Sequence, residues 1–142
     1  MNTVLAFLLF VGVGAVAVVH ALWGLGSTWP EPNQEALARG VVGDGHKRMP
    51  PPWQCFAVAV LLALVALWPW YVLGRASDSF ALTGTFAIAG TFVARCWAGY
   101  SPRWRAHFND EPFATRDKRY YSPYCLLLGV GYLALLAGEM ER

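Results

Sequence analysis

Two ionisable side chains, His20 and Arg95, interrupt long apolar stretches of the sequence and are the first candidates for chemistry. A neutral imidazole can accept or donate a hydrogen bond, and a guanidinium binds carboxylate or phosphate groups through several N–H donors. An unpaired charge in apolar surroundings is unfavourable, so an inward-facing Arg95 implies an anionic partner. Two simpler interpretations stay open: His20 bonds one helix to another, and Arg95 reaches out to lipid head groups.

The sequence offers few protein anions to Arg95. Asp110, Glu111 and Asp117 in the second long loop are candidates to fold back on it, and a lipid phosphate or an anionic substrate is the alternative source of negative charge. No Asp or Glu lies within the long apolar stretches themselves. Their absence argues against a proton-coupled pump, because such pumps depend on carboxylates inside the membrane.

Three cysteines, Cys55, Cys96 and Cys125, are expected at the same depth as His20 if the apolar stretches form an up-and-down bundle. Three thiolates and one imidazole would suit a tetrahedral metal ion. However, the cysteines form no CxxC pair, and Cys is a common small apolar residue in protein interiors. We therefore expect these residues to serve packing and expect no metal; metal binding and redox chemistry remain alternatives for them.

The positions of the few charged residues mark the ends of the helices that carry these side chains. Of 142 residues, 56% are hydrophobic and 14% are charged, whereas an ordinary soluble domain has about 25% charged residues. A bilayer core requires about 20 helical residues without unpaired charge, and four such stretches occur: residues 3–23, 53–73, 80–99 and 122–138. The sequence therefore predicts an all-α integral membrane four-helix bundle with up-down topology, one transmembrane domain over residues 1–142.

Two alternatives to this topology fit less well. Buried helices of a soluble protein would need polar faces to cover them, and the four stretches have none. A cleaved signal peptide over the first stretch would need Lys or Arg ahead of the apolar run, and there is none. We therefore interpret the first stretch as a retained helix.

The two long connections, residues 24–52 and 99–121, are predicted to lie on the cytoplasmic side, with both termini outside. They contain eight Lys and Arg residues, whereas the opposite side has only Arg75 and Arg142, and basic residues concentrate in cytoplasmic loops. We expect a short interfacial helix in each connection, over residues 33–39 and 102–108. Ser101 and Ser122, each followed by Pro, are interpreted as helix N-caps.

This topology brings polar and aromatic residues from all four spans to the cytoplasmic end of the bundle. We predict a ligand-binding site there, with hydrogen-bond donors and walls supplied by His20, Trp23, Trp29, Trp53, Arg95, Trp97, Arg103, Arg105, Arg119 and Tyr124. The expected ligand is a small anionic or amphipathic molecule, or the head group of a membrane lipid. The formal net charge of only +2 argues against nucleic acid as a partner.

Two other functions stay open. Glycines at positions 12, 14, 84, 90, 129 and 131 could form faces that pack against partner membrane helices, which is typical of an accessory subunit or a homo-oligomer. A small membrane enzyme is the second alternative. The sequence identifies no catalytic residue and no cofactor, so enzymatic activity is left undecided.

Three segments of the sequence together carry a family resemblance. They are His20-Ala-Leu-Trp-Gly-Leu-Gly26 with Trp29-Pro30, Arg95-Cys-Trp97, and Asp117-Lys-Arg-Tyr-Tyr-Ser-Pro-Tyr-Cys-Leu-Leu-Leu-Gly129. With them the chain resembles an uncharacterised family of small four-span bacterial membrane proteins, domain of unknown function 3995. The likeness covers nearly the whole chain; it implies the four-span topology and a bacterial plasma membrane, and it implies no activity.

A weaker similarity links the chain to membrane methyltransferases and sterol-type reductases. Those enzymes have an Arg-His-Pro-x-Tyr run before a helix at the end that binds the cofactor. Residues 119–124 read Arg-Tyr-Tyr-Ser-Pro-Tyr, so the His is missing here. The resemblance implies an enzyme of this kind only as the second alternative.

Overall fold

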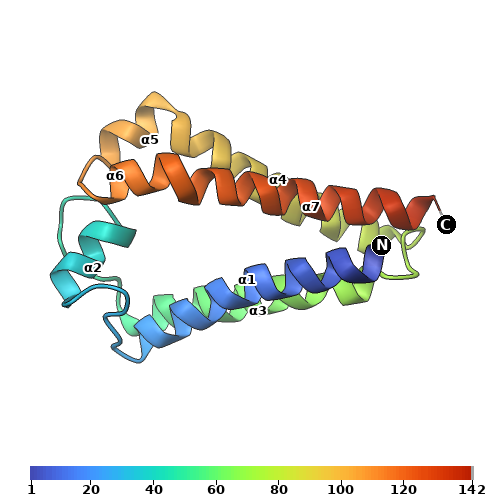
Figure 1. The fold of residues 1–142 in the computed structure, drawn as a ribbon, viewed down its shortest axis with the longest axis horizontal. Helices are drawn as coiled ribbons and strands as arrows, with labels where there is room; N and C mark the ends of the chain where they lie inside the picture. The colour runs from blue at the N-terminus through green and yellow to red at the C-terminus, as the bar shows by residue number, and fades with distance from the viewer. Residues whose placement is uncertain (142) are drawn as a thin grey trace.

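Four long helices form the body of the protein. The computed structural model describes residues 1–141, and all regular structure within them is helical. The long helices, each long and apolar enough to cross a membrane, are α1 (Asn2–Gly24), α3 (Pro52–Val72), α4 (Ser79–Tyr100) and α7 (Ser122–Met140) (Figure 1). The predicted all-α bundle of four spans is thereby confirmed, with every helix end within two residues of its expected position.

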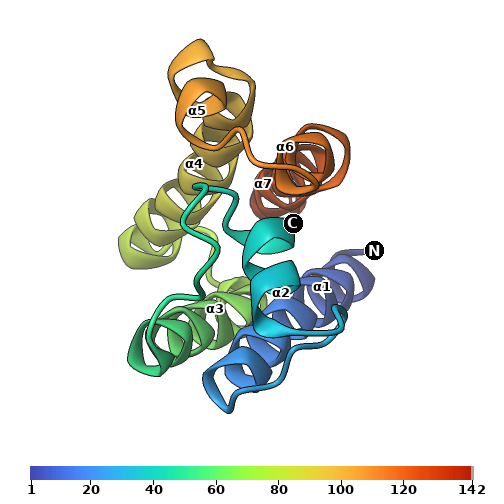
Figure 2. The same cartoon turned by 90° about the vertical axis from the view of Figure 1, so that its left-hand side faces the viewer.

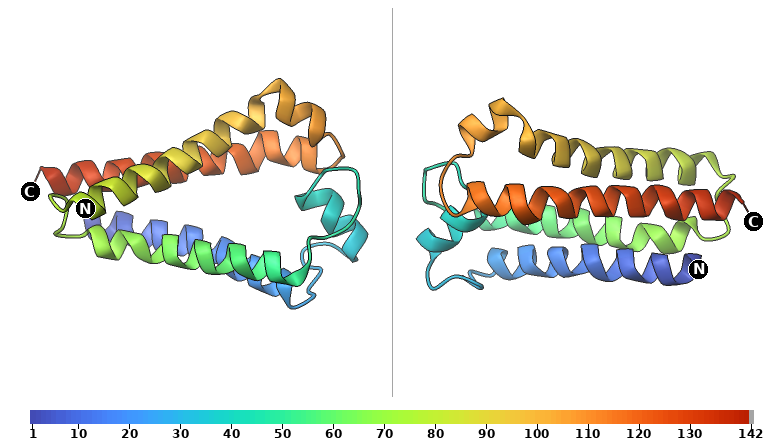
Figure 3. Two further views of the ribbon diagram at one scale, coloured as in Figure 1. Left: turned by 180° about the vertical axis from the view of Figure 1, so that it is seen from behind. Right: turned by 45° about the horizontal axis from the view of Figure 1, so that its top comes forward.

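The four helices associate as two pairs. α1 packs mainly along α3, and α4 packs mainly along α7. The pairs converge at the end that holds both termini and diverge toward the end that holds the long loops (Figures 1 and 3). At the closed end Leu9, Tyr132 and Leu135 are buried together, and the Tyr132 hydroxyl donates to the Val65 carbonyl at 2.6 Å. The bundle is therefore tightly closed at one end only.

Large apolar side chains cover the outside of the bundle. Leu8 is 60% exposed, Leu61 is 61% exposed and Leu127 is 67% exposed. A soluble monomer rarely leaves such faces open to water, whereas hydrocarbon covers them without penalty. Together with the four candidate spans, these faces identify an integral membrane protein.

Short helices occupy both long loops, as predicted. α2 (Gln34–Val41) begins at Asn33, whose side chain accepts a hydrogen bond from the Ala36 N–H. α5 (Pro102–His107) begins at Ser101, whose hydroxyl accepts from the Trp104 N–H, so the predicted Ser101 cap is confirmed. Seen from the loop end, α2 lies across the middle of the bundle (Figure 2).

The predicted N-cap at Ser122 is wrong, because Ser122 is already the first residue of α7 and no side chain caps the start of that helix. The helical backbone continues from α6 (Phe113–Arg116) through a π-helical turn, η1 (Asp117–Tyr121), into α7. Pro123 has no N–H for the carbonyl four residues earlier, and a wider turn accommodates that loss. The Ser122 backbone N–H accordingly bonds the Asp117 carbonyl, five residues back.

The prediction that the spans contain no carboxylate is also wrong. α7 extends to Met140 and buries Glu139, which is only 7% exposed. Its carboxylate accepts hydrogen bonds from the Asn2 side chain and from the Gly74 backbone N–H, both at 2.6 Å. Glu139 is tolerated because these donors stabilise its oxygens. It ties the first residues of α1 and the α3–α4 turn to the end of α7.

A glycine pair on α4 tests the packing of α3 on α4. A side chain at Gly84 would overlap the Trp68 ring, whereas one at Gly90 meets nothing within 4 Å. We expect Gly84→Ala to lower the free energy of unfolding by about 1–3 kcal/mol, the usual effect of overpacking. Gly90→Ala is the matched control and should cause no loss. Unfolding by sodium dodecyl sulfate in mixed micelles measures both, and equal stabilities would contradict the packing described here.

Candidate functional site

A fully buried carboxylate joins three helices at the loop end. Asp117, which is 0% exposed, accepts hydrogen bonds from Arg95 Nη2 at 2.6 Å, Trp104 Nε1 at 3.0 Å and Ser122 Oγ at 3.2 Å. These donors come from α4, α5 and α7 respectively. The π-helical turn places Asp117 on the side of the helix that faces α4.

The anionic partner of Arg95 is therefore the protein's own Asp117, one of the three carboxylates predicted for this role. Asp110 instead pairs with Arg39, and Glu111 accepts hydrogen bonds from Thr115. The Arg95 guanidinium also lies 4.4 Å from the centre of the Trp104 ring, in a cation–π contact. Arg95 is thus fixed in direction and neutralised in charge.

The two long loops are bound to each other by contacts between residues distant in the sequence. Arg116 forms an ion pair with Glu31, and the Tyr121 hydroxyl donates to the Gly40 carbonyl at 3.0 Å. A side chain at Gly40 would require Arg116 to move, because a Cβ there would lie 2.6 Å from Arg116 Nη1. These contacts hold α2 over the ends of the two diverging helix pairs.

A cavity of about 520 Å³ lies beneath α2, between α1 and α7. Residues of α1 form one wall, and η1 with the start of α7 forms the opposite wall. Its lining comprises Gly12, Ala15, Val16, Val19, His20, Trp23, Trp29, Pro30, Val41, Arg95, Phe113, Arg116, Tyr121, Tyr124 and Cys125. Most of these side chains are apolar or aromatic, and the charged ones are the two arginines whose carboxylate partners were described above.

Five of the ten residues predicted for the ligand site line this cavity: His20, Trp23, Trp29, Arg95 and Tyr124. The other five do not. Trp53 and Trp97 are 67% and 75% exposed on the outside of the bundle, Arg103 and Arg119 are exposed, and Arg105 is half-buried. Residues two apart on a helix point in nearly opposite directions, so Trp97 cannot share the orientation of Arg95.

Sequence reasoning missed Phe113, Arg116 and Tyr121 as lining residues, and it missed Glu31 as a partner. Arg116 and Tyr121 lie next to the charged residues 117–119, and this cluster of charges was the one local signal that could have drawn attention to them. Their contacts with the first loop join residues more than 80 positions apart. No local spacing in the sequence indicates such a contact.

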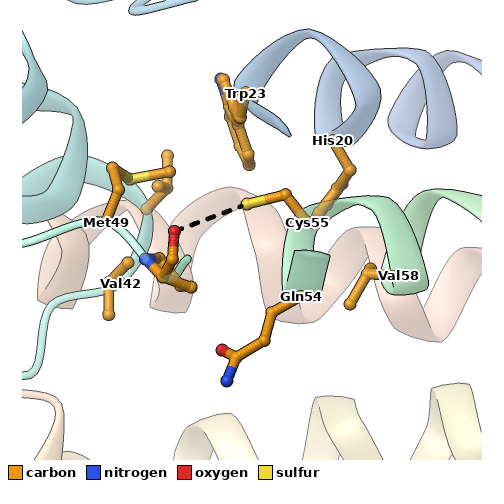
Figure 4. A pocket seen from close by; sticks show the side chains of 9 residues that line it. His20, Trp23, Val42, Met49, Gln54, Cys55 and Val58 are labelled. Carbon is orange, nitrogen blue, oxygen red and sulfur yellow. Dashed lines mark hydrogen bonds between the residues drawn. The ribbon is translucent and has the colours of Figure 1, made fainter. Parts of the chain in front are cut away.

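His20 borders both this cavity and a smaller one of about 180 Å³. Its Nδ1 lies 2.9 Å from the Val16 carbonyl, so a proton on Nδ1 leaves Nε2 as an acceptor. The smaller cavity is also lined by Trp23, Met49 and Cys55, whose thiol lies 4.0 Å from the Pro50 carbonyl (Figure 4). The His20 and Trp23 rings are tilted to each other with their centres 4.9 Å apart, and both residues line both cavities.

The cysteines do not gather around His20. Cys55 lines the smaller cavity, Cys125 lines the larger one, and Cys96 is buried in α4. Within residues 1–141, no group of three or more His, Cys, Asp or Glu side chains is placed to hold a metal ion. The three cysteines come from α3, α4 and α7, and a similar depth in the bundle does not by itself assemble them with His20 into one site.

Removing the charge of Asp117 tests whether the buried ion pair stabilises the fold. Asp117→Asn leaves Arg95 without its anion, and we expect the free energy of unfolding to fall by about 3 kcal/mol. This value is at the low end for breaking a buried ion pair, because Arg95 keeps some contact with solvent.

The matched control for Asp117→Asn is Asp110→Asn. It breaks the more exposed pair with Arg39, and we expect it to lose less than about 1 kcal/mol. Unfolding in mixed micelles measures both variants. A loss for Asp117→Asn no larger than for Asp110→Asn would refute the assigned role of the buried pair.

The comparisons with known proteins agree with this architecture. A family model described as "Protein of unknown function (DUF3995)" matches residues 13–132, which include all four long helices in whole or in part. No curated protein and no solved structure matches the chain. Since the matched region covers most of the 142 residues, the chain belongs to the DUF3995 family of proteins of unknown function.

Proposed function

We propose that this protein binds an amphipathic molecule of the membrane, such as a lipid, in the cavity between α1 and α7. The cavity follows α1 from Gly12 to Trp23, which at 1.5 Å per residue corresponds to about 17 Å along the membrane-crossing direction. Its volume of about 520 Å³ lies within the range of about 300–1,000 Å³ that small-molecule sites occupy.

The change from apolar to polar lining along this length is the observation that supports the proposal. Near the middle of the membrane the cavity is lined by Gly12, Ala15, Val16 and Val19. Toward the loops it is lined by His20, Arg95 and Arg116, with Trp23 and Trp29 beside them. An amphipathic molecule would place its tail among the first group and its head among the second.

The accessory-subunit alternative has lost most of its motivation. Four of the six glycines on which it rested serve packing inside the chain: Gly12 faces Tyr124, Gly84 faces Trp68, Gly129 faces Ala89 and Val93, and Gly131 faces Leu9. Gly14 and Gly90 alone among the six face open space. No observation favours the enzyme alternative, so ligand binding is the function we put forward.

We also propose that both long loops face the cytoplasm of a bacterial cell. The loops lie at one end of the bundle and both termini at the other (Figure 3). The two long loops carry eight Lys and Arg residues, whereas within residues 1–141 the opposite end has Arg75 alone. The excess of basic residues supports this orientation, because such residues are retained on the cytoplasmic side.

Filling the cavity tests the binding proposal. Val19 lines the cavity, whereas its neighbour Val18 is 59% exposed on the outside of α1. We expect Val19→Trp to reduce the amount of lipid that stays bound in native mass spectrometry by roughly tenfold, equivalent to about 1.4 kcal/mol, because the indole takes the space of the tail. Val18→Trp introduces the same side chain into the lipid-facing surface and should leave the bound lipid unchanged. Equal retention by both variants would contradict the proposed site.

Single cysteines test the orientation. His46 in the first long loop and Ser77 in the α3–α4 turn are both exposed. We expect a membrane-impermeant maleimide to label Ser77→Cys on intact cells and to label His46→Cys only after the membrane is opened. The unsubstituted protein is the control for labelling of Cys55, Cys96 and Cys125. The reverse labelling pattern would show that the long loops lie outside the cell. Labelling of both variants on intact cells would contradict the placement of the loops and the α3–α4 turn on opposite sides of the membrane.

A further inference from the structure

The charges that line the cavity cancel. Its two cations are Arg95 and Arg116, and each is paired with a carboxylate: Arg95 with Asp117 and Arg116 with Glu31. Two positive and two negative charges leave a sum of zero. A cavity that binds a phosphate or a carboxylate would instead be expected to present uncompensated cations or backbone N–H groups.

Neither carboxylate is placed to leave when a ligand arrives. Asp117 is fully buried and accepts hydrogen bonds from three side chains. The Glu31 side chain is 17% exposed, and its backbone N–H is bonded to the Thr28 carbonyl at 2.8 Å. An anion that entered the cavity would lose its hydration and meet an ion pair rather than a free cation, so its desolvation would not be offset.

The cavity nevertheless retains hydrogen-bond donors. A guanidinium has five N–H groups, and one carboxylate cannot occupy all of them. Tyr124 also lines the cavity, but its hydroxyl lies next to Gly12 of α1, at the end assigned to the tail, so the two guanidinium groups are the donors available to the head. Donors of this kind suit the lone pairs of ester, ketone or hydroxyl oxygens, which leave water at a far smaller penalty than a charged group does.

We infer that the molecule held in this cavity has an uncharged head that accepts hydrogen bonds, as diacylglycerol does, rather than an anionic head. The inference rests on the proposed function and adds the chemical class of the ligand. It narrows the ligand expected from sequence, a small anionic or amphipathic molecule or a lipid head group, to an uncharged amphipathic molecule, because both arginines of the cavity have carboxylate partners. Arg95 and Arg116 then act as oriented hydrogen-bond donors, not as a net positive charge.

Two lipids with identical acyl chains test the inference. Diacylglycerol and phosphatidate differ only in the charged phosphate, and each is added to delipidated protein in a neutral detergent for native mass spectrometry. We expect diacylglycerol to bind at least about tenfold more tightly than phosphatidate, and the Val19→Trp variant to lose this binding. Preference for phosphatidate would overturn the inference while supporting the proposed function. Binding of neither lipid, or equal binding by Val19→Trp, would overturn the proposed function itself.

Removing one compensating charge provides a second test on the same protein. Glu31→Gln preserves the shape of the side chain and leaves Arg116 uncompensated, so the cavity gains one positive charge. We expect phosphatidate affinity to rise by about tenfold in this variant, while diacylglycerol still binds and shows that the cavity is intact. The control is Glu35→Gln, which removes an equal charge from an exposed pair with Lys47 away from the cavity and should change neither affinity. Unchanged phosphatidate binding in Glu31→Gln would overturn the inference.

Discussion

The contact between Asp117 and Arg95 is the interaction on which the loop end of this protein depends. A guanidinium inside or beside the hydrocarbon is unfavourable by a few kcal/mol unless an anion accompanies it. The spans themselves supply no such anion at that depth, so the helix that carries Asp117 has to present it to α4. The π-helical turn achieves this presentation, and Trp104 and Ser122 supply the remaining donors. The same contact explains why residue 99 is a glycine, because a side chain at this position would overlap Ser122.

The pair also explains why the bundle is open at one end. It fixes α4, α5 and α7 to one another, while α1 and α3 form a separate unit. At the end with the termini, Tyr132 and Glu139 bind the two units directly. At the loop end the units meet through the first long loop, by way of Glu31 and Gly40. A bridge made of loop residues keeps the units apart, and the cavity lies in the space between α1 and α7.

The sequence predicted the elements of this fold because the signal for a membrane span is the absence of charge, and that signal is local. It also predicted the Ser101 cap and the level at which His20, Trp23 and Arg95 meet. It could not indicate which face of each helix points inward, because helices in hydrocarbon are apolar on every side and have no polar stripe to mark the outside. Trp97 and Trp53 were placed in the site for this reason, although both face outward.

Pairing across the chain was the other feature that local patterns could not supply. Asp117 was one of three equivalent candidates for Arg95, and the choice among them depended on a π-helical turn that Pro123 makes favourable. The fourth apolar stretch ends at residue 138, so the sequence alone places Glu139 beyond the last span, where a Glu normally reaches water. Its hydrogen bonds come from Asn2 and Gly74, at the far ends of other elements. Both corrections have one physical origin: a carboxylate can be buried when distant donors converge on it.

The same convergence of donors on buried carboxylates underlies the ligand class that we propose for the cavity. Within a medium of low polarity, a free cation attracts any anion that reaches it and also destabilises the fold that carries it. A cation whose partner is built into the fold avoids that destabilisation and retains spare N–H groups with a fixed direction. Arg95 and Arg116 each have a built-in partner, and the wall formed by α1 is apolar from Gly12 to Val19. For the lipid that we propose as ligand, selection would follow from the positions of the hydrogen-bond donors, from the length of the apolar wall and from the zero net charge of the lining.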